Sequence, residues 1–133
     1  MKKLFIQPNA SIKEALRQFD RTNKGCLVVV NKRNKLLGTL TDGDVRRFIL
    51  KGKFLKDKIN GIYEKNPTFL KQNDYSPSQA KDLFLKKEVD IIPIIDRFKK
   101  IVDLVFFSEL FRKNKSYKNS KNFSAVKKML GRR

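Results

Sequence analysis

Apolar and polar positions along the first half of the chain predict five elements in a fixed order. Apolar residues form a short strand at Leu4–Ile6, and Ser11 precedes a stretch in which they recur on one face of a helix. Two apolar runs, Cys26–Val30 and Leu36–Leu40, follow as strands separated by a polar turn. A closing helix starts around Asp44, so the predicted order is β-α-β-β-α.

The second half of the chain repeats this order. When the sequence is displaced by 65 positions, landmark residues of the two halves fall on one another without a gap. The matched pairs are Leu4 and Phe69, Ser11 and Ser76, Ala15 and Ala80, Phe19 and Phe84, Val29 and Ile94, and Asp44 and Glu109. Small repeats usually pack on each other because neither buries enough apolar surface alone. We therefore predict an α/β fold of two β-α-β-β-α repeats, with the ligand site in the cleft between them.

The starts of the two equivalent helices agree with the repeat. Ser11 followed by Glu14, and Ser76 followed by Gln79, are typical of capping boxes. Pro77 suits the first position of a helix, where no amide hydrogen is needed. Both helices are expected to begin directly after these serines.

The repeats divide the chain into four segments. We assign residues 1–52 to the first repeat, 53–68 to a connecting segment, 69–111 to the second repeat and 112–133 to a basic tail. Apolar residues of the connecting segment are spaced for a partly buried helix, namely Phe54, Leu55, Ile59, Ile62 and Tyr63. The tail has no Asp or Glu, which is typical of a flexible linker or of an arm for RNA, DNA or an acidic membrane surface.

The residue types that are missing restrict the chemistry. The chain has no histidine and one cysteine, Cys26, which lies inside an apolar strand and is expected to be buried. A Ser-His-Asp triad, a Cys-His pair and a Cys/His zinc site are therefore excluded, and we predict no catalytic residues and no metal site. No apolar run reaches the roughly 20 residues of a bilayer span, and no signal-peptide core follows Met1, so we expect a cytoplasmic protein without a membrane span.

The segment Gly38–Asp44 resembles the signature of CBS domains, in which a glycine and an apolar strand precede Thr/Ser-x-x-Asp. Residues 4 to about 111 are similar to the two-copy module that such domains form. The longer stretch Leu37–Arg47 is similar to modules attached to sugar-1-phosphate nucleotidyltransferases and to sugar-phosphate isomerases of bacterial surface-polysaccharide pathways. The resemblance implies a non-catalytic regulatory module that binds an adenosine-type or other ribonucleotide and modulates a partner enzyme of this kind.

The residue types of the motif suit a nucleotide. Thr41 ends a strand and Asp44 begins a helix, so a hydroxyl and free helix amides converge where a phosphate could bind. The Asp44 carboxylate can accept two hydrogen bonds from a ribose, and Gly43 allows close approach of the backbone. Capping of the helix by Thr41, Asp42 and Asp44 is the alternative explanation. The resemblance adds four flanking residues to the site, which are Asn9, Ser11, Gly25 and Cys26.

The second copy departs from the motif. Phe106 stands at the position of Thr41 and Glu109 at that of Asp44, so the hydroxyl and the short carboxylate are both lost. Phe106 could stack on a base or belong to the core. We predict a degenerate second site and one ligand per chain.

The charge of the chain supports a second function. Its formal net charge is +19, and such a surplus attracts polyanions. Lysines in the body of the chain are scattered, as on a solvated surface, whereas residues 112–133 concentrate positive charge. The alternative is therefore a basic nucleic-acid-binding protein that acts through its C-terminal tail.

A homodimer is also expected. The resemblance implies that two-copy modules pair through their helices. Four apolar residues exceed what two short helices need internally, and such a surplus usually marks an interface. They are Phe48, Leu50, Phe107 and Phe111.

Overall fold

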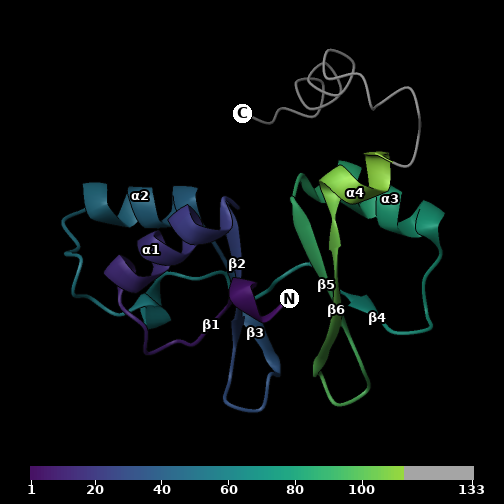
Figure 1. Ribbon diagram of the computed structural model, residues 1–133, viewed down its shortest axis with the longest axis horizontal. Coiled ribbons are helices and arrows are strands. Elements are labelled where there is room, and N and C mark those ends of the chain that lie inside the picture. The colour runs from purple at the N-terminus through teal and green to yellow at the C-terminus, as the bar shows by residue number, and fades with distance from the viewer. Residues whose placement is uncertain (113–133) are drawn as a thin grey trace.

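Two three-stranded sheets stand side by side in the computed structural model, one in each half of the chain (Figure 1). The structure describes residues 1–112. The first half contains the 3₁₀ turn η1 (Lys2–Leu4), β1 (Phe5–Ile6), α1 (Ile12–Thr22), β2 (Cys26–Val30), β3 (Leu36–Thr41) and α2 (Asp42–Leu50). After the 3₁₀ turn η2 (Ile59–Gly61), the second half contains β4 (Leu70–Lys71), α3 (Pro77–Lys87), β5 (Ile91–Ile95), β6 (Ile101–Phe106) and α4 (Phe107–Arg112). The predicted α/β fold of two β-α-β-β-α repeats is confirmed.

The two sheets share one topology and one register. In each sheet the first and second strands are parallel, and the second and third form an antiparallel hairpin. Cys26 lies opposite Thr41 in the first hairpin, and Ile91 lies opposite Phe106 in the second. Both hairpins also carry an irregularity at the equivalent step of the middle strand. The repeat seen in the sequence therefore holds at the level of single residue pairs.

The predicted helix starts are also present. The Ser11 hydroxyl accepts a hydrogen bond from the Glu14 amide at 3.1 Å. Ser76 and Gln79 form a reciprocal capping box, and Pro77 occupies the first turn of α3. Helix α2 begins at Asp42, two residues before the expected start, because Thr41 serves as its N-terminal cap.

The buried core extends across both halves. Strand β2 is buried along its whole length, including Cys26. Four residues of β5 and β6 join its cluster, namely Ile91, Ile95, Ile101 and Leu104. A smaller cluster beneath α3 and α4 contains Phe84 and Phe107, whose rings meet edge to face with 5.9 Å between centroids. Each half therefore completes the core of the other.

The two hairpins are bonded to each other where they turn, at the end of the molecule opposite the helices (Figure 1). The Leu36 amide donates to the Lys99 carbonyl oxygen at 2.9 Å, and the Ile101 amide donates to the Asn34 carbonyl oxygen at 3.1 Å. These bonds join residues that are far apart in the sequence. They fix the hairpin ends of the two repeats against each other.

The connecting segment is not the helix that its apolar spacing predicted. Only the 3₁₀ turn η2 is helical, while Phe54 and Leu55 are exposed and Ile59 is fully buried. Carbonyl oxygens of the segment instead accept hydrogen bonds from the first amides of α1, with Ile12 donating to Asp57 at 2.8 Å. These amides have no partner within their own helix. Capping of α1 therefore holds the segment, which is made mostly of turns, against the start of that helix.

Gly38 allows this segment to cross the edge of β3. The Thr39 amide donates to the Glu64 carbonyl oxygen at 3.1 Å, and the Glu64 amide donates to the Thr39 carbonyl oxygen at 2.8 Å. A Cβ atom at Gly38 would overlap the Glu64 carbonyl oxygen and the Tyr63 ring. The glycine of the motif is therefore required by packing of the backbone.

Two further expectations concern Phe107 and the C-terminal end of the chain. Phe107, assigned to an exposed dimer surface, is 1% exposed and belongs to the core beneath α3 and α4, so that assignment was wrong. The expectations for residues 113–133 and for the Phe111 side chain lie outside the described part of the chain. Among residues 1–112, no helix has the length and apolar character needed to cross a bilayer.

Candidate functional site

A cleft of about 520 Å³ separates the two halves at the end of the sheets where α2 begins. One wall consists of the start of β2, the end of β3 and the first turns of α2, and the other consists of the segments that precede β4 and β5. Five of the eight expected site residues line this cleft, which are Gly25, Cys26, Thr41, Asp42 and Gly43. The motif therefore lies at the boundary between the repeats.

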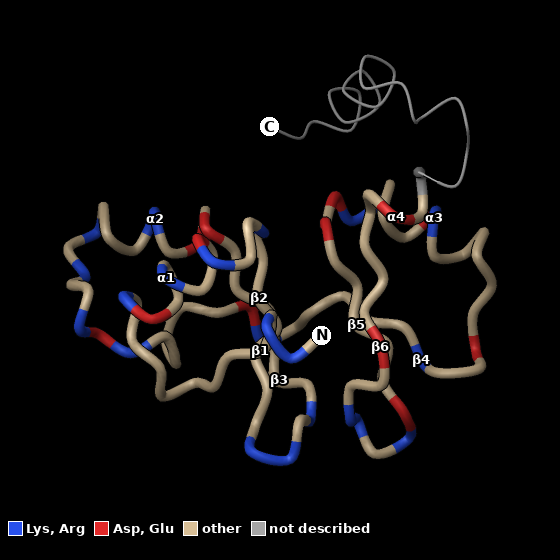
Figure 2. The backbone as a smooth tube through the Cα atoms, in the orientation of Figure 1, with Lys and Arg blue, Asp and Glu red and all other residues tan. Residues whose placement is uncertain are grey.

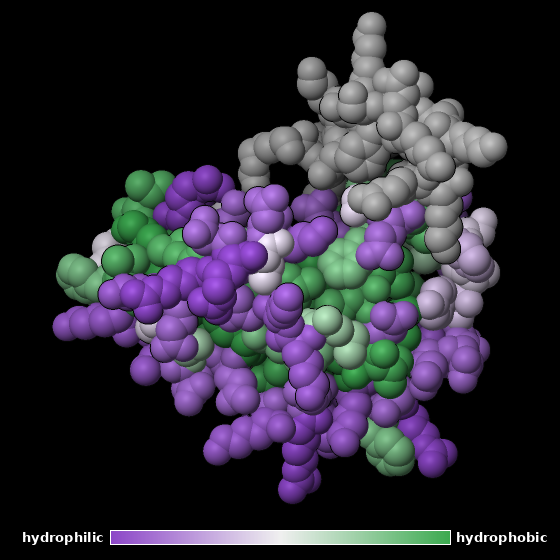
Figure 3. Space-filling view, in the orientation of Figure 1, coloured by the Kyte–Doolittle hydropathy of each residue, from purple (hydrophilic) through white to green (hydrophobic). Residues whose placement is uncertain are grey.

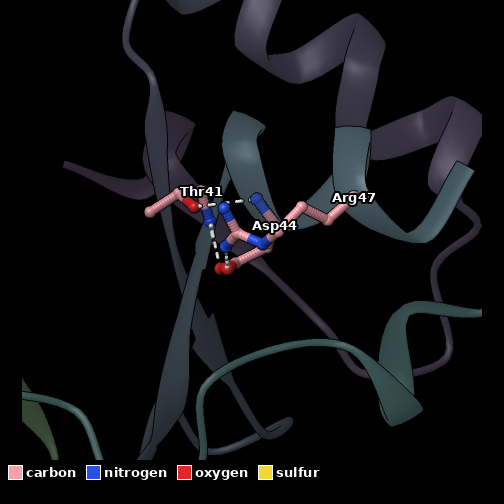
Figure 4. A network of polar contacts seen from close by, with 3 residues as sticks. All are labelled: Thr41, Asp44 and Arg47. Carbon is pink, nitrogen blue, oxygen red and sulfur yellow. Dashed lines mark hydrogen bonds and ion pairs between the residues drawn. The ribbon is translucent and has the colours of Figure 1, made fainter. Parts of the chain in front are cut away.

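Thr41 and Asp44 form a reciprocal capping box at the start of α2 (Figure 4). The Asp44 amide donates to the Thr41 hydroxyl oxygen at 3.1 Å, and the Thr41 amide donates to Asp44 Oδ2 at 3.0 Å. The capping explanation is thus realised for these two residues. Because the Thr41 hydroxyl only accepts in this pair, its own hydrogen can still donate to a ligand oxygen.

The second oxygen of Asp44 is occupied by Arg47, one turn further along α2 (Figure 4). The guanidinium Nη2 lies 2.5 Å from Asp44 Oδ1, and the arginine side chain is 62% exposed. Arg47 also lines the cleft, whereas Asp44 does not. In this arrangement the Asp44 carboxylate is turned toward its own helix, and the arginine stands between it and solvent.

The register of β2 and β3 explains why Gly25 and Cys26 accompany the motif. Cys26 pairs with Thr41, and the Asp42 amide donates to the Gly25 carbonyl oxygen at 3.1 Å. The Asp42 amide is bonded to Gly25 and the Asp44 amide to Thr41, and the Gly43 amide between them takes part in neither bond. It lies at the N-terminal end of a helix, which favours anions. The start of α2 therefore offers a backbone donor and a hydroxyl to the cleft.

Asn9 and Ser11 do not belong to this site. Strand β1 runs parallel to β2 with Ile6 opposite Val29, so the residues that follow β1 lie near the turn of the first hairpin. Thr41 lies opposite Cys26, at the other end of β2. Ser11 instead caps α1 and pairs with Lys58 of the connecting segment. The structure therefore places these two residues away from the cleft that the motif lines.

The second half supplies residues that the sequence analysis missed. Thr68, Glu88 and Asp90 line the cleft opposite α2. The repeat itself holds the signal, since positions 88–91 are the counterparts of 23–26, two of which were assigned to the site. With Asp42 they place three carboxylates around a single arginine, Arg47. Within the described residues, no three acidic, histidine or cysteine side chains are placed to hold a metal ion.

The degenerate copy of the motif, at the end of β6 and the start of α4, lines two smaller cavities, one of which shares Gly25, Cys26, Asp90 and Ile91 with the cleft. Their volumes are about 210 and 460 Å³, and Phe106 borders both. Lys24 Nζ lies 4.9 Å from the centre of the Phe106 ring. Phe106 is half-buried, so it packs against the central core on one side and borders these cavities on the other.

Comparison with known proteins agrees with this geometry. The sequence model of the CBS domain matches residues 1–51. An uncharacterised protein of Helicobacter pylori (strain ATCC 700392 / 26695) is 30% identical over 105 residues, or 79% of this chain and 32% of that protein. The arabinose 5-phosphate isomerase GutQ of Escherichia coli (strain K12) is 25% identical over 103 residues, or 77% of this chain and 32% of the isomerase. The chain thus spans about a third of the length of these relatives.

Solved structures extend the similarity to the second half of the chain. A CBS-domain structure, NE2398, superposes with a TM-score of 0.73 at 25% identity and covers 83% of this chain and 86% of its own. CBSX2, solved in complex with AMP, superposes with a TM-score of 0.71 at 17% identity and covers 86% of this chain and 89% of its own. Both alignments extend well beyond residue 51, so the second half has the fold of the first. Residues 1–51 thus match the CBS domain in sequence, and the chain as a whole has the fold of a tandem pair of CBS domains.

Proposed function

We propose that this CBS pair is a regulatory module that binds an adenosine-type ribonucleotide in the cleft beside Thr41 and thereby modulates a sugar-phosphate enzyme. The observation that carries the proposal is the position of the motif. Thr41, Gly43 and the start of α2 face a cavity that both repeats enclose. A hydroxyl, a backbone amide and a helix dipole at one point suit a phosphate. AMP in the related CBSX2 structure supports the ligand class.

Binding of the ribose requires a rearrangement of Arg47. One Asp44 oxygen accepts from the Thr41 amide and the other is paired with Arg47. Ribose hydroxyls would replace the guanidinium on Asp44, and the exposed arginine would then be free to pair with the phosphate. The exchange keeps the carboxylate hydrogen-bonded throughout, so it needs no uncompensated burial of charge.

The charge of the cleft favours a ligand with few negative charges. Asp42, Glu88 and Asp90 line it against one arginine, so each additional phosphate meets like charge. We therefore propose that a nucleoside monophosphate is preferred over a triphosphate. A magnesium ion carried by the triphosphate would offset part of this repulsion.

The relatives support the class of partner. The chain matches 32% of the length of GutQ. We propose that a sugar-phosphate isomerase, or another enzyme of sugar-nucleotide or surface-polysaccharide metabolism, is the regulated partner in the cytoplasm. Nucleotide binding between the repeats would change their relative packing, and this change is what a partner can sense.

A homodimer is part of the proposal, on a surface that shares only Leu50 with the one expected. Three apolar side chains at the end of α2 and just after it are exposed, to 81% at Leu50, 66% at Phe54 and 47% at Leu55. Apolar surface gathers over this end of α2 in the space-filling view (Figure 3). We call these three residues the α2 patch. Exposed apolar groups of this kind usually mark interfaces.

Calorimetric titration of the full chain tests the ligand proposal. AMP is expected to bind with one molecule per chain, and ATP in the presence of EDTA is expected to bind more weakly than AMP. Excess Mg²⁺ should bring the affinity for ATP closer to that for AMP. Absence of binding by every ribonucleotide at millimolar concentration would refute nucleotide sensing, and tighter binding of ATP in EDTA would refute the charge argument alone.

A further inference from the structure

A second open groove, of about 830 Å³, lies on the other end of the second sheet from the nucleotide cleft. Its floor is formed by the ends of β4 and β5 and by the turn between β5 and β6. In the first half, the connecting segment packs beside the equivalent end of the sheet, where it pairs with Ser11 and accepts hydrogen bonds from the first amides of α1. No segment of residues 1–112 covers it in the second half.

Two exposed aromatic rings flank this groove. Phe69 is 40% exposed and Phe98 is 58% exposed, although large apolar side chains are normally withdrawn from water. The Arg97 guanidinium lies 4.9 Å from the centre of the Phe98 ring, so the ring sits beside a cation at the tip of the turn. In the space-filling view, an isolated apolar surface at this turn is surrounded by hydrophilic side chains (Figure 3).

Positive charge gathers around the same place. The bonds between Leu36 and Lys99 and between Ile101 and Asn34 bring the turns of both hairpins together. The two turns contribute six cationic side chains, which are Lys32, Arg33, Lys35, Arg97, Lys99 and Lys100. Basic residues occupy both turns in the tube view (Figure 2). Charges that are scattered along the sequence are therefore concentrated at one end of the fold.

The nearby carboxylates do not neutralise this charge. Asp96 Oδ1 accepts hydrogen bonds from the Phe98 amide at 2.8 Å and from the Lys100 amide at 3.0 Å, so it stabilises the turn. Asp74 is the other acidic residue that lines the groove. Within residues 1–112, none of the six cations of the hairpin turns forms an ion pair with a carboxylate.

We propose that this groove and the joined hairpin turns bind single-stranded nucleic acid. Phe69 and Phe98 offer flat faces on which unpaired bases stack, and the lysines and arginines of the turns lie beside them for the phosphates. A duplex hides the faces of its bases, so the exposed rings favour a single strand. The groove lies at the hairpin end of the sheets and the nucleotide cleft at the helix end, and the two sites share no lining residue.

Fluorescence tests the stacking directly, because the chain contains no tryptophan. The variant Phe98→Trp of the full chain carries one tryptophan in the proposed groove, and Leu85→Trp is the matched control, with an exposed side chain of α3 replaced. Oligo(dT) is expected to quench the Phe98→Trp emission strongly at concentrations that leave the Leu85→Trp emission unchanged. Equal quenching of both variants, or of neither, would overturn the proposal.

Charge reversal tests the contribution of the turns. Lys32→Glu with Arg33→Glu should weaken binding of labelled oligo(dT) in anisotropy titrations by about ten-fold or more, and should make the dependence of log Kd on log salt shallower by about 1.4 for two lost phosphate contacts. The control, Lys86→Glu with Lys87→Glu on α3, changes the net charge equally and is expected to alter Kd less than two-fold. Equal weakening by the two double variants would mean that general positive charge, and not this surface, holds the strand.

Two competitors identify the class of ligand. A duplex of the same sequence and charge is expected to compete less well than the single strand. Vesicles containing phosphatidylserine are expected to compete no better than the duplex does. Stronger competition by the vesicles would overturn the proposal in favour of a membrane surface.

Discussion

Asp44 has a structural task and a proposed binding task, and both involve the same carboxylate. Its oxygens accept from the Thr41 amide and from Arg47, so the residue stabilises the start of α2 before any ligand arrives. The sequence presented capping and ligand contact as alternatives. The structure shows that Asp44 caps α2. Contact with a ligand is compatible with this capping, because a carboxylate oxygen can accept more than one hydrogen bond.

Asp44→Ala is therefore expected to have two measurable effects. Loss of the capping box should lower the free energy of unfolding by about 1 kcal/mol, or the melting temperature by roughly 3–6 °C, and the exposed ion pair should add little. The same variant should lose most of the thermal stabilisation that AMP gives to the parent protein. Thermal denaturation with and without AMP measures both effects.

The matched control for this variant is Gln79→Ala. It removes the reciprocal partner of Ser76 from the capping box of α3, far from the cleft along the chain. A similar fall in melting temperature is expected, with the stabilisation by AMP retained. If Asp44→Ala kept the full stabilisation by AMP, the ligand would have to bind without this carboxylate.

Gly38 gives a second prediction at the scale of one residue. Gly38→Ala should destabilise the protein by about 1–3 kcal/mol, because the new methyl group meets the backbone of the connecting segment at Glu64. Gly61→Ala is the control, since a Cβ atom at that position has open space around it. Chemical denaturation should show the first change and a shift of less than about 0.5 kcal/mol for the second.

At the scale of elements, the sequence predicts well where local signals decide. The strand limits Cys26–Val30 and Ile91–Ile95 and the start of α3 at Pro77 match the structure, because burial and capping are encoded within a few residues. The connecting segment was mistaken for a helix because apolar spacing does not reveal that its carbonyl groups bond to α1. The sequence did not reveal the position of Asn9 and Ser11 because the parallel pairing of β1, which decides their end of the sheet, is a long-range contact.

Burial of the connecting segment is expected to contribute to the free energy of unfolding. Ile59 is fully buried, so Ile59→Ala should lower the free energy of unfolding by about 2–5 kcal/mol. Lys56→Ala, in the same segment and outside the α2 patch, should cost under about 0.5 kcal/mol because that side chain is exposed. Urea denaturation of both variants measures the contrast, and similar losses would contradict the described path of the segment.

At the scale of the whole molecule, the α2 patch predicts an assembly. Light scattering of the parent protein should give twice the chain mass of 15.6 kDa at micromolar concentration. Leu50→Asp should shift the mass toward that of one chain, because it places a charge on the most exposed residue of the patch. Leu85→Asp on α3 is the control and should remain a dimer. A parent protein of one chain mass would refute the proposed interface.

The bonds between the two hairpin turns also decide how the repeats can move. They join the halves at one end of the sheets, while the nucleotide cleft separates them at the other end. A ligand that drew the walls of the cleft together would therefore rotate the two repeats toward each other, with the hairpin junction as the hinge. The outer ends of the helices would move furthest, so a partner docked there would undergo the largest displacement. Nucleic acid bound at the hinge would move very little.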